Sequence, residues 1–225
     1  LNIDPGKATN RTVITFVGPP ETIVDAAYSL ISKAKELIDM RLHKGEHPRM
    51  GAVDVCPFIP ISGVSMKETV DLAHQLGKRV GSELLIPVYC YENAAKNNMR
   101  VNLANCRSGE YEGLKNKLRD VKWKPDYGPN KFNETVAKFG AVAIGARDFL
   151  VAYNINLNTT STRRANSVAF DLREAGRVKR EGGTLTGKII TDKNGEPVRK
   201  PGYFKNLQGI GWSIKEYGVW LLYTS

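Results

Sequence analysis

The amino-acid sequence predicts an α+β fold, with helices packed on one side of a mixed β-sheet. Short β-branched runs alternate with longer stretches whose apolar residues recur at helical spacing, which predicts strand–helix–strand units. Long continuous apolar runs, typical of the strands of a fully parallel sheet, are few. A region rich in glycine, proline and small residues ends near Gly145, where a new strand begins, so we expect a domain boundary there.

The first predicted elements are a strand and a long helix. Residues 10–17 are rich in β-branched side chains and stop at Gly18-Pro19-Pro20, which predicts a strand that ends in a turn. Pro20 suits the first turn of a helix, and one apolar stripe carries that helix to about Met40. The apolar run over residues 52–61 contains two prolines and therefore predicts an edge strand, since proline cannot donate to a ladder.

The middle of the chain predicts one long helix and several shorter elements. Ser65-Met-Lys-Glu68 has the pattern of a capping box, which predicts a helix from there to about Leu84. A short strand over residues 87–91 and a helix over residues 108–119 follow. Residues 126–145 predict a long functional loop, because glycine, proline and small residues dominate them.

The last third predicts two strands around a helix and a polar insertion. Residues 149–157 predict a strong strand, and residues 162–174 predict a helix with Gly176 just past its end. Residues 179–201 are polar with glycine turns and predict a surface hairpin or insertion. A final strand is expected over residues 204–214.

Length and composition narrow the class of protein. A chain of 225 residues can bury a substantial core, as one large domain or two small ones. No apolar run of about 18 residues predicts a membrane span, and no secretory signal is visible. Cys56, Cys90 and Cys106 are odd in number and irregularly spaced, which favours free thiols and a cytoplasmic location. Neither GxGxxG nor a Walker loop occurs, so nucleotide binding has no positive support.

The charge balance points to an anionic partner. The chain contains 33 Lys and Arg residues and 23 Asp and Glu residues, which give a formal net charge of +10 and a sequence pI near 9.5. Nucleic acid is the usual partner at such a pI, but the basic residues are dispersed and no zinc finger or RNP box accompanies them. An acidic metabolite fits the charge equally well, and composition leaves both open.

Residues 41–51 contain two of the three histidines and the highest concentration of candidate catalytic and binding side chains in the chain. His43-Lys-Gly-Glu46-His47 matches the inverted zinc-peptidase motif, which needs a helix to bring its ligands to one face. Gly45 and Pro48 disfavour that helix, and the sequence has no further ligand cluster, so we expect a structured loop without metal. In such a loop a histidine suits proton transfer at neutral pH. The local residues alone leave a catalytic and an inert histidine both open.

A family resemblance goes beyond this single motif. The chain resembles the glutamate formiminotransferases, folate enzymes of histidine breakdown, over Leu1 to about Gly218, and the matching motifs fall in family order. They are Thr9-Asn-Arg-Thr-Val13, Thr15-Phe-Val-Gly-Pro-Pro20, Leu37-Ile-Asp-Met40, Arg41–Gly51, Asp54–Pro60, Pro87-Val-Tyr89, Arg107-Ser-Gly-Glu-Tyr111, Trp123–Pro129, Gly145-Ala-Arg147, Asn154-Ile-Asn156 and Gly209-Ile-Gly-Trp212.

The resemblance implies an architecture. Two α/β sandwich subdomains are expected, each a mixed, largely antiparallel sheet layered with helices, over residues 1–145 and 146–225. A tunnel between them and a homodimer are expected as well. The family's first strand and helix are missing before Leu1, and the residues after Gly218 depart from the family pattern, so the second subdomain is expected to be truncated.

The resemblance also implies site residues. His47 falls on the family's catalytic base, and Asp4 falls on an aspartate that assists it. The folate-contacting loop falls on residues 128–140, lengthened here around residues 133–138, and its aromatic falls near Phe139. The candidate substrate- and folate-binding residues are therefore Arg11, Lys44, Arg49, Gly128, Pro129, Phe139 and Gly140.

The expected activity is transfer of the formimino group between 5-formiminotetrahydrofolate and L-glutamate, giving N-formimino-L-glutamate and tetrahydrofolate. Tetrahydrofolate is then a co-substrate, folates with one or several glutamyl groups are partners, and neither a metal, nucleic acid nor a membrane is expected. The family's cyclodeaminase half is not expected. A formyl donor within the same family and a non-catalytic folate- or polyanion-binding module are the alternatives, ahead of a nucleic-acid-binding protein and a zinc hydrolase.

Overall fold

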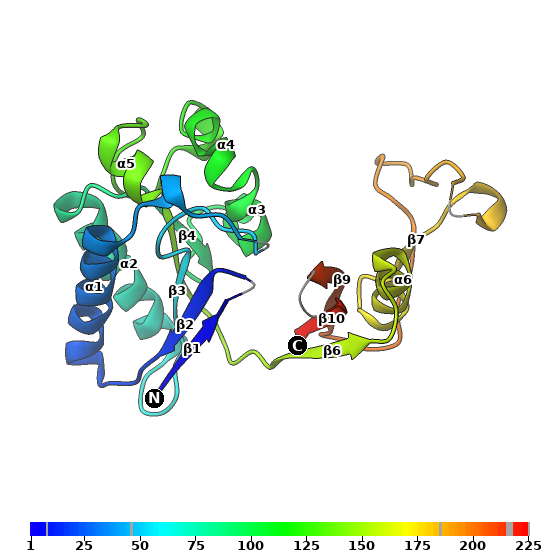
Figure 1. Cartoon of the computed structure of the whole chain (residues 1–225), viewed down its shortest axis with the longest axis horizontal. Helices are drawn as coiled ribbons and strands as arrows, with labels where there is room; N and C mark the ends of the chain where they lie inside the picture. Colours follow the sequence, from blue (N-terminus) through cyan, green and yellow to red (C-terminus); the bar gives the residue numbers. More distant parts are fainter. Residues whose placement is uncertain (8, 46, 185, 215–217, 225) are drawn as a thin grey trace. The chain divides into compact units, whose positions relative to one another are not determined.

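The structure, a computed structural model, describes residues 1–7, 9–45, 47–184, 186–214 and 218–224. The chain divides into two compact units, Leu1–Phe149 and Leu150–Ser225 (Figure 1). The boundary predicted at residue 145 falls inside the last strand of the first unit.

The first unit is built around a three-stranded parallel sheet. Its strands are β3 (Val55–Phe58), β5 (Val142–Ala146) and β4 (Val88–Glu92), in the order β3-β5-β4. Placing β3 at an edge confirms the expectation drawn from its proline. The central strand β5 is fully buried and lies where a loop was predicted, so that prediction is wrong for residues 142–146.

The small residues of β5 explain the error. A Cβ on Gly145 would lie 2.5 Å from the Tyr91 ring, so a glycine is needed where the neighbouring strand's aromatic side chain covers the sheet. Alanine and glycine have weak strand propensity, and the strand's burial on both faces removes the alternation that marks a half-exposed strand. The same predicted loop also contains α5 (Glu134–Phe139), whose N-cap Asn133 accepts from the Val136 amide.

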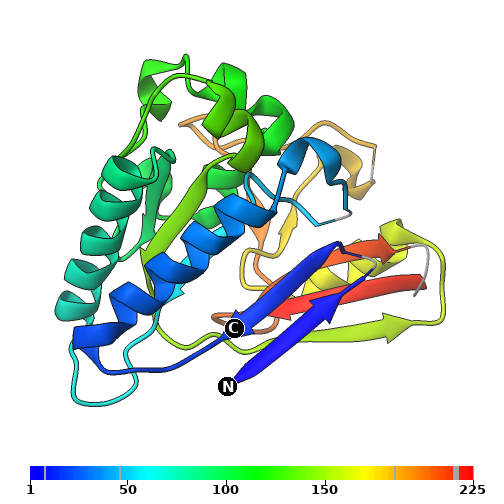
Figure 2. The same cartoon turned by 60° about the vertical axis from the view of Figure 1, so that its left-hand side comes forward.

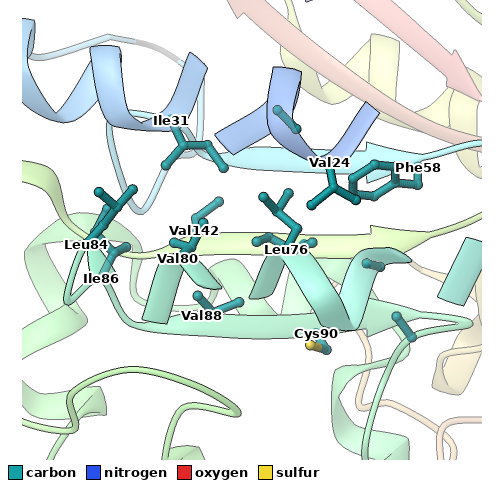
Figure 3. Packing of buried hydrophobic residues seen from close by; sticks show 14 of the residues in the cluster. Val24, Ile31, Phe58, Leu76, Val80, Leu84, Ile86, Val88, Cys90 and Val142 are labelled. Carbon is teal, nitrogen blue, oxygen red and sulfur yellow. The ribbon is translucent and has the colours of Figure 1, made fainter. Parts of the chain in front are cut away.

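Two long helices cover one face of this sheet. They are α1 (Pro20–Leu37) and α2 (Met66–Glu83), and they pack on each other and on the strands (Figure 1). Figure 3 shows their buried side chains pointing at those of the sheet. This core contains Val24, Ala27, Ile31, Phe58, Ala73, Leu76, Val80, Leu84, Ile86, Val88, Cys90, Ala94, Phe139, Val142, Ile144 and Ala146.

Shorter helices cover the opposite face. They are α3 (Leu103–Arg107), α4 (Glu110–Lys117) and α5, and they contribute Cys106, Leu114 and Val136 to a second core. Tyr89 and Tyr91 of β4 point into this core, while Val88 and Cys90 point into the first. The period-2 alternation of a strand therefore places consecutive residues on two helix-covered faces.

The helix signals in the sequence are confirmed with small shifts. Pro20 begins α1, and the capping box of α2 is complete, with Ser65 and Glu68 bonding each other's backbone. The first helix ends at Leu37, three residues before the predicted end, and Leu37 itself is exposed rather than part of the buried stripe.

A hairpin stands apart from the parallel sheet in the first unit. Strands β1 (Asn2–Gly6) and β2 (Arg11–Thr15) form a two-stranded antiparallel sheet of their own (Figure 2). The prediction of a strand before the first helix is confirmed. A 3₁₀ turn, η1 (Met40–Leu42), follows α1 and leads into the histidine-rich segment. Two further 3₁₀ turns, η2 (Asn98–Arg100) and η3 (Val121–Trp123), connect the later helices.

The second unit is an antiparallel sheet with one helix. Strands β6 (Ala152–Leu157), β10 (Gly218–Thr224) and β9 (Gln208–Ile214) pair in the order β6-β10-β9, and α6 (Thr162–Leu172) packs on β9 and β10. Short strands β7 (Arg177–Val178) and β8 (Arg199–Lys200) pair around the polar insertion, which contains the 3₁₀ turn η4 (Glu181–Gly183).

The α+β class is confirmed. The second unit has the antiparallel sheet that was expected, whereas the three-stranded sheet of the first unit is parallel and only its hairpin is antiparallel. Within the described part of the chain, no helix combines the length and the apolarity needed to cross a membrane.

Candidate functional site

The histidine-rich segment between η1 and β3 is a structured loop, as predicted. Its described residues 43–45 lie outside any helix, so the helical spacing that a zinc-peptidase motif requires is absent. Glu46, the middle ligand of that motif, lies outside the described residues. Among the residues that are described, no group of three His, Cys, Asp or Glu side chains could hold a metal ion.

The hairpin β1–β2 holds the start of this loop. Asn10, in the hairpin turn, has its Nδ2 3.2 Å from His43 Nδ1 and donates to the Lys44 carbonyl at 2.8 Å. A Cβ on Gly45 would lie 2.5 Å from the Thr9 carbonyl oxygen, so the two backbones approach at a distance that only glycine permits. The hairpin and the loop therefore form one surface.

His47 lies half-buried in this loop with a defined ring orientation. Its Nδ1 is 2.7 Å from the Pro48 carbonyl oxygen, and a carbonyl can only accept, so Nδ1 carries the proton in this contact. In the neutral ring Nε2 is then the basic nitrogen. Burial lowers the pKa of His47, and the positive charge of Arg11 lowers it further. The ring is therefore poised to be neutral, and able to accept a proton, at physiological pH.

An ion pair braces the other end of the loop. Asp54 Oδ2 lies 2.5 Å from Arg107 Nη2, and Asp54 Oδ1 accepts from the Met50 amide at 3.0 Å. The charges of both side chains act on the His47 ring, Arg107 lowering its pKa and Asp54 raising it. Arg107 and Asp54 were not predicted as site residues. The available signal was their presence in two of the matching motifs.

Asp4 and Arg11 share one face of the hairpin. In the ladder Asp4 is opposite Val13, and Arg11 lies two residues before Val13, so the two side chains are diagonal neighbours. Partial burial and then the charge of Arg107 lower the pKa of Arg11, while Asp4 and Asp54 raise it. The structure thus brings Asp4, Arg11, His47, Asp54 and Arg107 into one electrostatic cluster.

Lys44 and Arg49 lie at a neighbouring hollow of about 470 Å³. Its wall also includes Gly45, Gly109, Glu110 and Glu112. The Arg49 guanidinium is already bonded to Glu112 through both Nη atoms, at 2.9 and 2.6 Å, and to Glu110 at 3.1 Å. Glu112 raises the pKa of Arg49 by accepting those bonds. A substrate carboxylate at Arg49 would compete with two protein carboxylates.

The predicted folate segment begins at a braced turn. Asp126 pairs with buried Arg100 at 2.6 Å and accepts from the Cys90 amide at 2.7 Å. Gly128 then has φ +81°, and a Cβ there would lie 2.2 Å from the Ile86 carbonyl oxygen. Gly128 is exposed and Pro129 is half-buried, so both retain surface for a ligand.

The end of the same segment is joined to the histidine loop. Gly140 is bridged to Gly51, the Ala141 amide donates to the Met50 carbonyl at 2.9 Å, and the Ala52 amide donates to the Phe139 carbonyl at 2.7 Å. The structure therefore brings together two segments that sequence analysis predicted separately.

Phe139 requires a correction. Its side chain is fully buried in the core beneath α1 and α2, so it presents no ring to a ligand. The following Gly140 is buried as well, with φ +85°, and acts through its backbone. The aromatic position that the resemblance placed in the folate loop is, in this chain, a core position.

Comparison with known proteins identifies relatives over nearly the whole chain. The sequence model described as "Formiminotransferase domain, N-terminal subdomain" matches residues 1–147, and the one described as "Formiminotransferase domain" matches residues 152–222. The second match extends four residues beyond Gly218, and β10 occupies that region. The expectation that the chain leaves the family pattern there is therefore wrong up to residue 222.

Curated relatives agree with these matches. The chain is 49% identical to the glutamate formimidoyltransferase of Thermoplasma acidophilum, covering 97% of this chain and 74% of that protein. It is 48% identical to the formimidoyltransferase-cyclodeaminase of Rattus norvegicus and 46% identical to that of Dictyostelium discoideum. These matches cover 96% and 97% of this chain but only 36% of each of the two longer proteins.

Proposed function

The chain belongs to the formiminotransferase family, and we propose that it is a glutamate formimidoyltransferase, which moves the formimino group between 5-formiminotetrahydrofolate and L-glutamate. The observation that carries the proposal is the 49% identity to a glutamate formimidoyltransferase over 97% of this chain. The ring orientation and the lowered pKa of His47 support the proposal, because a neutral imidazole can accept a proton in the reaction.

In the proposed mechanism His47 acts as a general acid and base through Nε2. As the α-amine of glutamate attacks the formimino carbon, Nε2 accepts the proton that the amine loses. The resulting imidazolium then returns a proton to N5 of the folate as that nitrogen departs. This relay avoids a poor, unprotonated leaving group. The hydrogen bond from Nδ1 to the Pro48 carbonyl keeps Nε2 directed at the transfer throughout.

The charged groups around His47 support the proposal. Asp4 acts on Arg11, and Arg11 in turn acts on His47, so we propose that Asp4 tunes the imidazole through that arginine. Lys44 and Arg49 are proposed to attract substrate carboxylates to the neighbouring hollow, and the overall charge of +10 favours anionic glutamate and folates. Gly128 and Pro129 are proposed contacts for the folate.

The wider expectations are also part of the proposal. Tetrahydrofolate serves as a co-substrate and not as a resident cofactor, and the protein works as a cytoplasmic homodimer. The alternative within the family is a formyl donor in place of the formimino donor. A non-catalytic folate-binding module is the alternative from another class, because the chain spans only 36% of the formimidoyltransferase-cyclodeaminases that it matches.

One assay separates these functions. The full chain is incubated with L-glutamate and either 5-formiminotetrahydrofolate or 5-formyltetrahydrofolate, and the amino-acid products are separated by chromatography. We expect N-formimino-L-glutamate from the first donor. Product from the formyl donor alone would select the family alternative, and folate binding without any product would select the binding module.

A further inference from the structure

Two arginines from distant parts of the chain converge on His47. Arg11 begins β2 and Arg107 ends α3, and the positive charges of both act on the imidazole ring. The charge of Arg107 also lowers the pKa of Arg11, while the carboxylates of Asp4 and Asp54 raise it. Two guanidinium groups beside an acid–base histidine form a ready site for an anion.

Arg107 is held in place with hydrogen-bonding capacity to spare. Asp54 contacts it at Nη2, at 2.5 Å, and thereby fixes the direction of the guanidinium plane. The Arg107 Nε donor is buried and has no hydrogen-bond partner within the described chain. The side chain as a whole keeps 21% of its surface exposed. A carboxylate that reaches the exposed part of an immobilised arginine forms charge-assisted hydrogen bonds with it.

Arg49 differs from Arg107 in this respect. Two glutamates already bond the Arg49 guanidinium through three contacts. Among the residues that the structure describes, Arg107 has one carboxylate partner, and its Nε has none. Of these two arginines, Arg107 is therefore the better placed to bind a further carboxylate.

The chemistry of the substrates decides which carboxylate this is. In glutamate the α-carboxylate and the reacting α-amine share one carbon, so a base that serves the amine must have the carboxylate beside it. In a folate the glutamyl carboxylates lie beyond the aminobenzoyl group, far from N5. Cations adjacent to the base therefore match the amino acid and not the folate tail.

We propose that Arg107, together with Arg11, binds the α-carboxylate of glutamate and thereby places its α-amine at His47 Nε2. The inference rests on the proposed function, and it adds a substrate-binding role for Arg107. Arg107 orients the substrate, while Asp54 orients Arg107.

The test compares four forms of the full chain: wild type, Arg107→Gln, Asp54→Asn and Arg119→Gln. Arg119 is exposed, lies in the turn after α4 and has no side-chain partner among the described residues, so it controls for the loss of one positive charge. In Arg107→Gln the KM for L-glutamate should rise roughly tenfold to a hundredfold, as expected when a hydrogen bond to a charged group is lost. The KM for the folate donor should stay within about twofold of wild type in all forms.

Asp54→Asn separates substrate binding by Arg107 from the structural role of the Asp54–Arg107 ion pair. The variant loses the ion pair but keeps the arginine. We therefore expect kcat to fall, and we expect the KM for glutamate to rise less than it does in Arg107→Gln. If Arg107 only braces the loop, both variants lower kcat and neither raises the KM for glutamate, which overturns the inference. A rise in the KM for folate alone in Arg107→Gln overturns it as well.

Binding without turnover distinguishes this inference from the proposed function. Calorimetric titration with L-glutamate of His47→Ala, and of the same variant carrying Arg107→Gln, reports the site directly. If the wild type has no transferase activity, glutamate binding that depends on Arg107 in these variants would support the site and reject the function. Transferase activity with an unchanged KM for glutamate in Arg107→Gln would retain the function and reject the site.

Discussion

Asp126→Asn is expected to destabilise the first unit by about 3 kcal/mol. The carboxylate lies 2.6 Å from Arg100, and the two side chains are only 4% and 5% exposed. Removing one partner of a buried ion pair costs about 3–5 kcal/mol, because the other charge stays desolvated and uncompensated. The lower end applies here, since Arg100 also donates to the Lys124 carbonyl at 2.6 Å and asparagine can still accept from the Cys90 amide.

Urea denaturation measures this effect. With a slope of about 1–3 kcal/mol per molar urea, a loss of 3 kcal/mol lowers the midpoint by at least about 1 M. Asp148→Asn removes an exposed carboxylate with no side-chain partner among the described residues, and should leave the midpoint unchanged. Replacing both partners, as Arg100→Met with Asp126→Leu, should cost less than Asp126→Asn alone. A loss below about 1 kcal/mol in Asp126→Asn would refute the assignment of the pair as a buried brace.

Two other predictions concern the site. The kcat/KM of the wild type should fall on the acid side only below pH 6.5, because the pKa of His47 is lowered and its neutral form is the base. Arg11→Gln removes a charge that opposes protonation, so its acid limb should move to higher pH, and an unmoved limb would contradict the coupling. Gly140→Ala puts a Cβ 2.2 Å from the Met50 carbonyl oxygen at φ +85°, and should cost more stability in urea than Gly63→Ala, which has φ +69° but open space. Equal losses in the two glycine variants would argue against a tight junction at Gly140.

Local sequence signals predicted the elements that depend on local contacts. The capping box of α2 and Pro20 at the start of α1 are contacts within one turn of a helix, so a single sequence contains them. Strand β5 was missed because its small residues are imposed by neighbours such as the Tyr91 ring, which is distant in sequence. Tertiary packing overrides propensity in such a strand.

The same distinction applies to the site. The local motif left the role of its histidines open, and the resemblance selected His47; the structure gives that residue an oriented ring with a lowered pKa. The charges that act on His47 include those of Arg107 and Asp54. These two residues are distant in sequence and pair with each other, and no local pattern could predict that pairing. Phe139 was misassigned because the resemblance marks a position in a segment and not the direction of a side chain, which here points into the core.

The most direct test of the central claim is the turnover of His47→Ala with 5-formiminotetrahydrofolate and L-glutamate, measured beside equilibrium binding of the folate. General acid–base catalysis is worth about 10²–10⁴-fold, so kcat should fall by that factor while the dissociation constant for folate stays near that of the wild type. Turnover within a few-fold of the wild type would contradict the claim that this imidazole carries the proton between the two nitrogens.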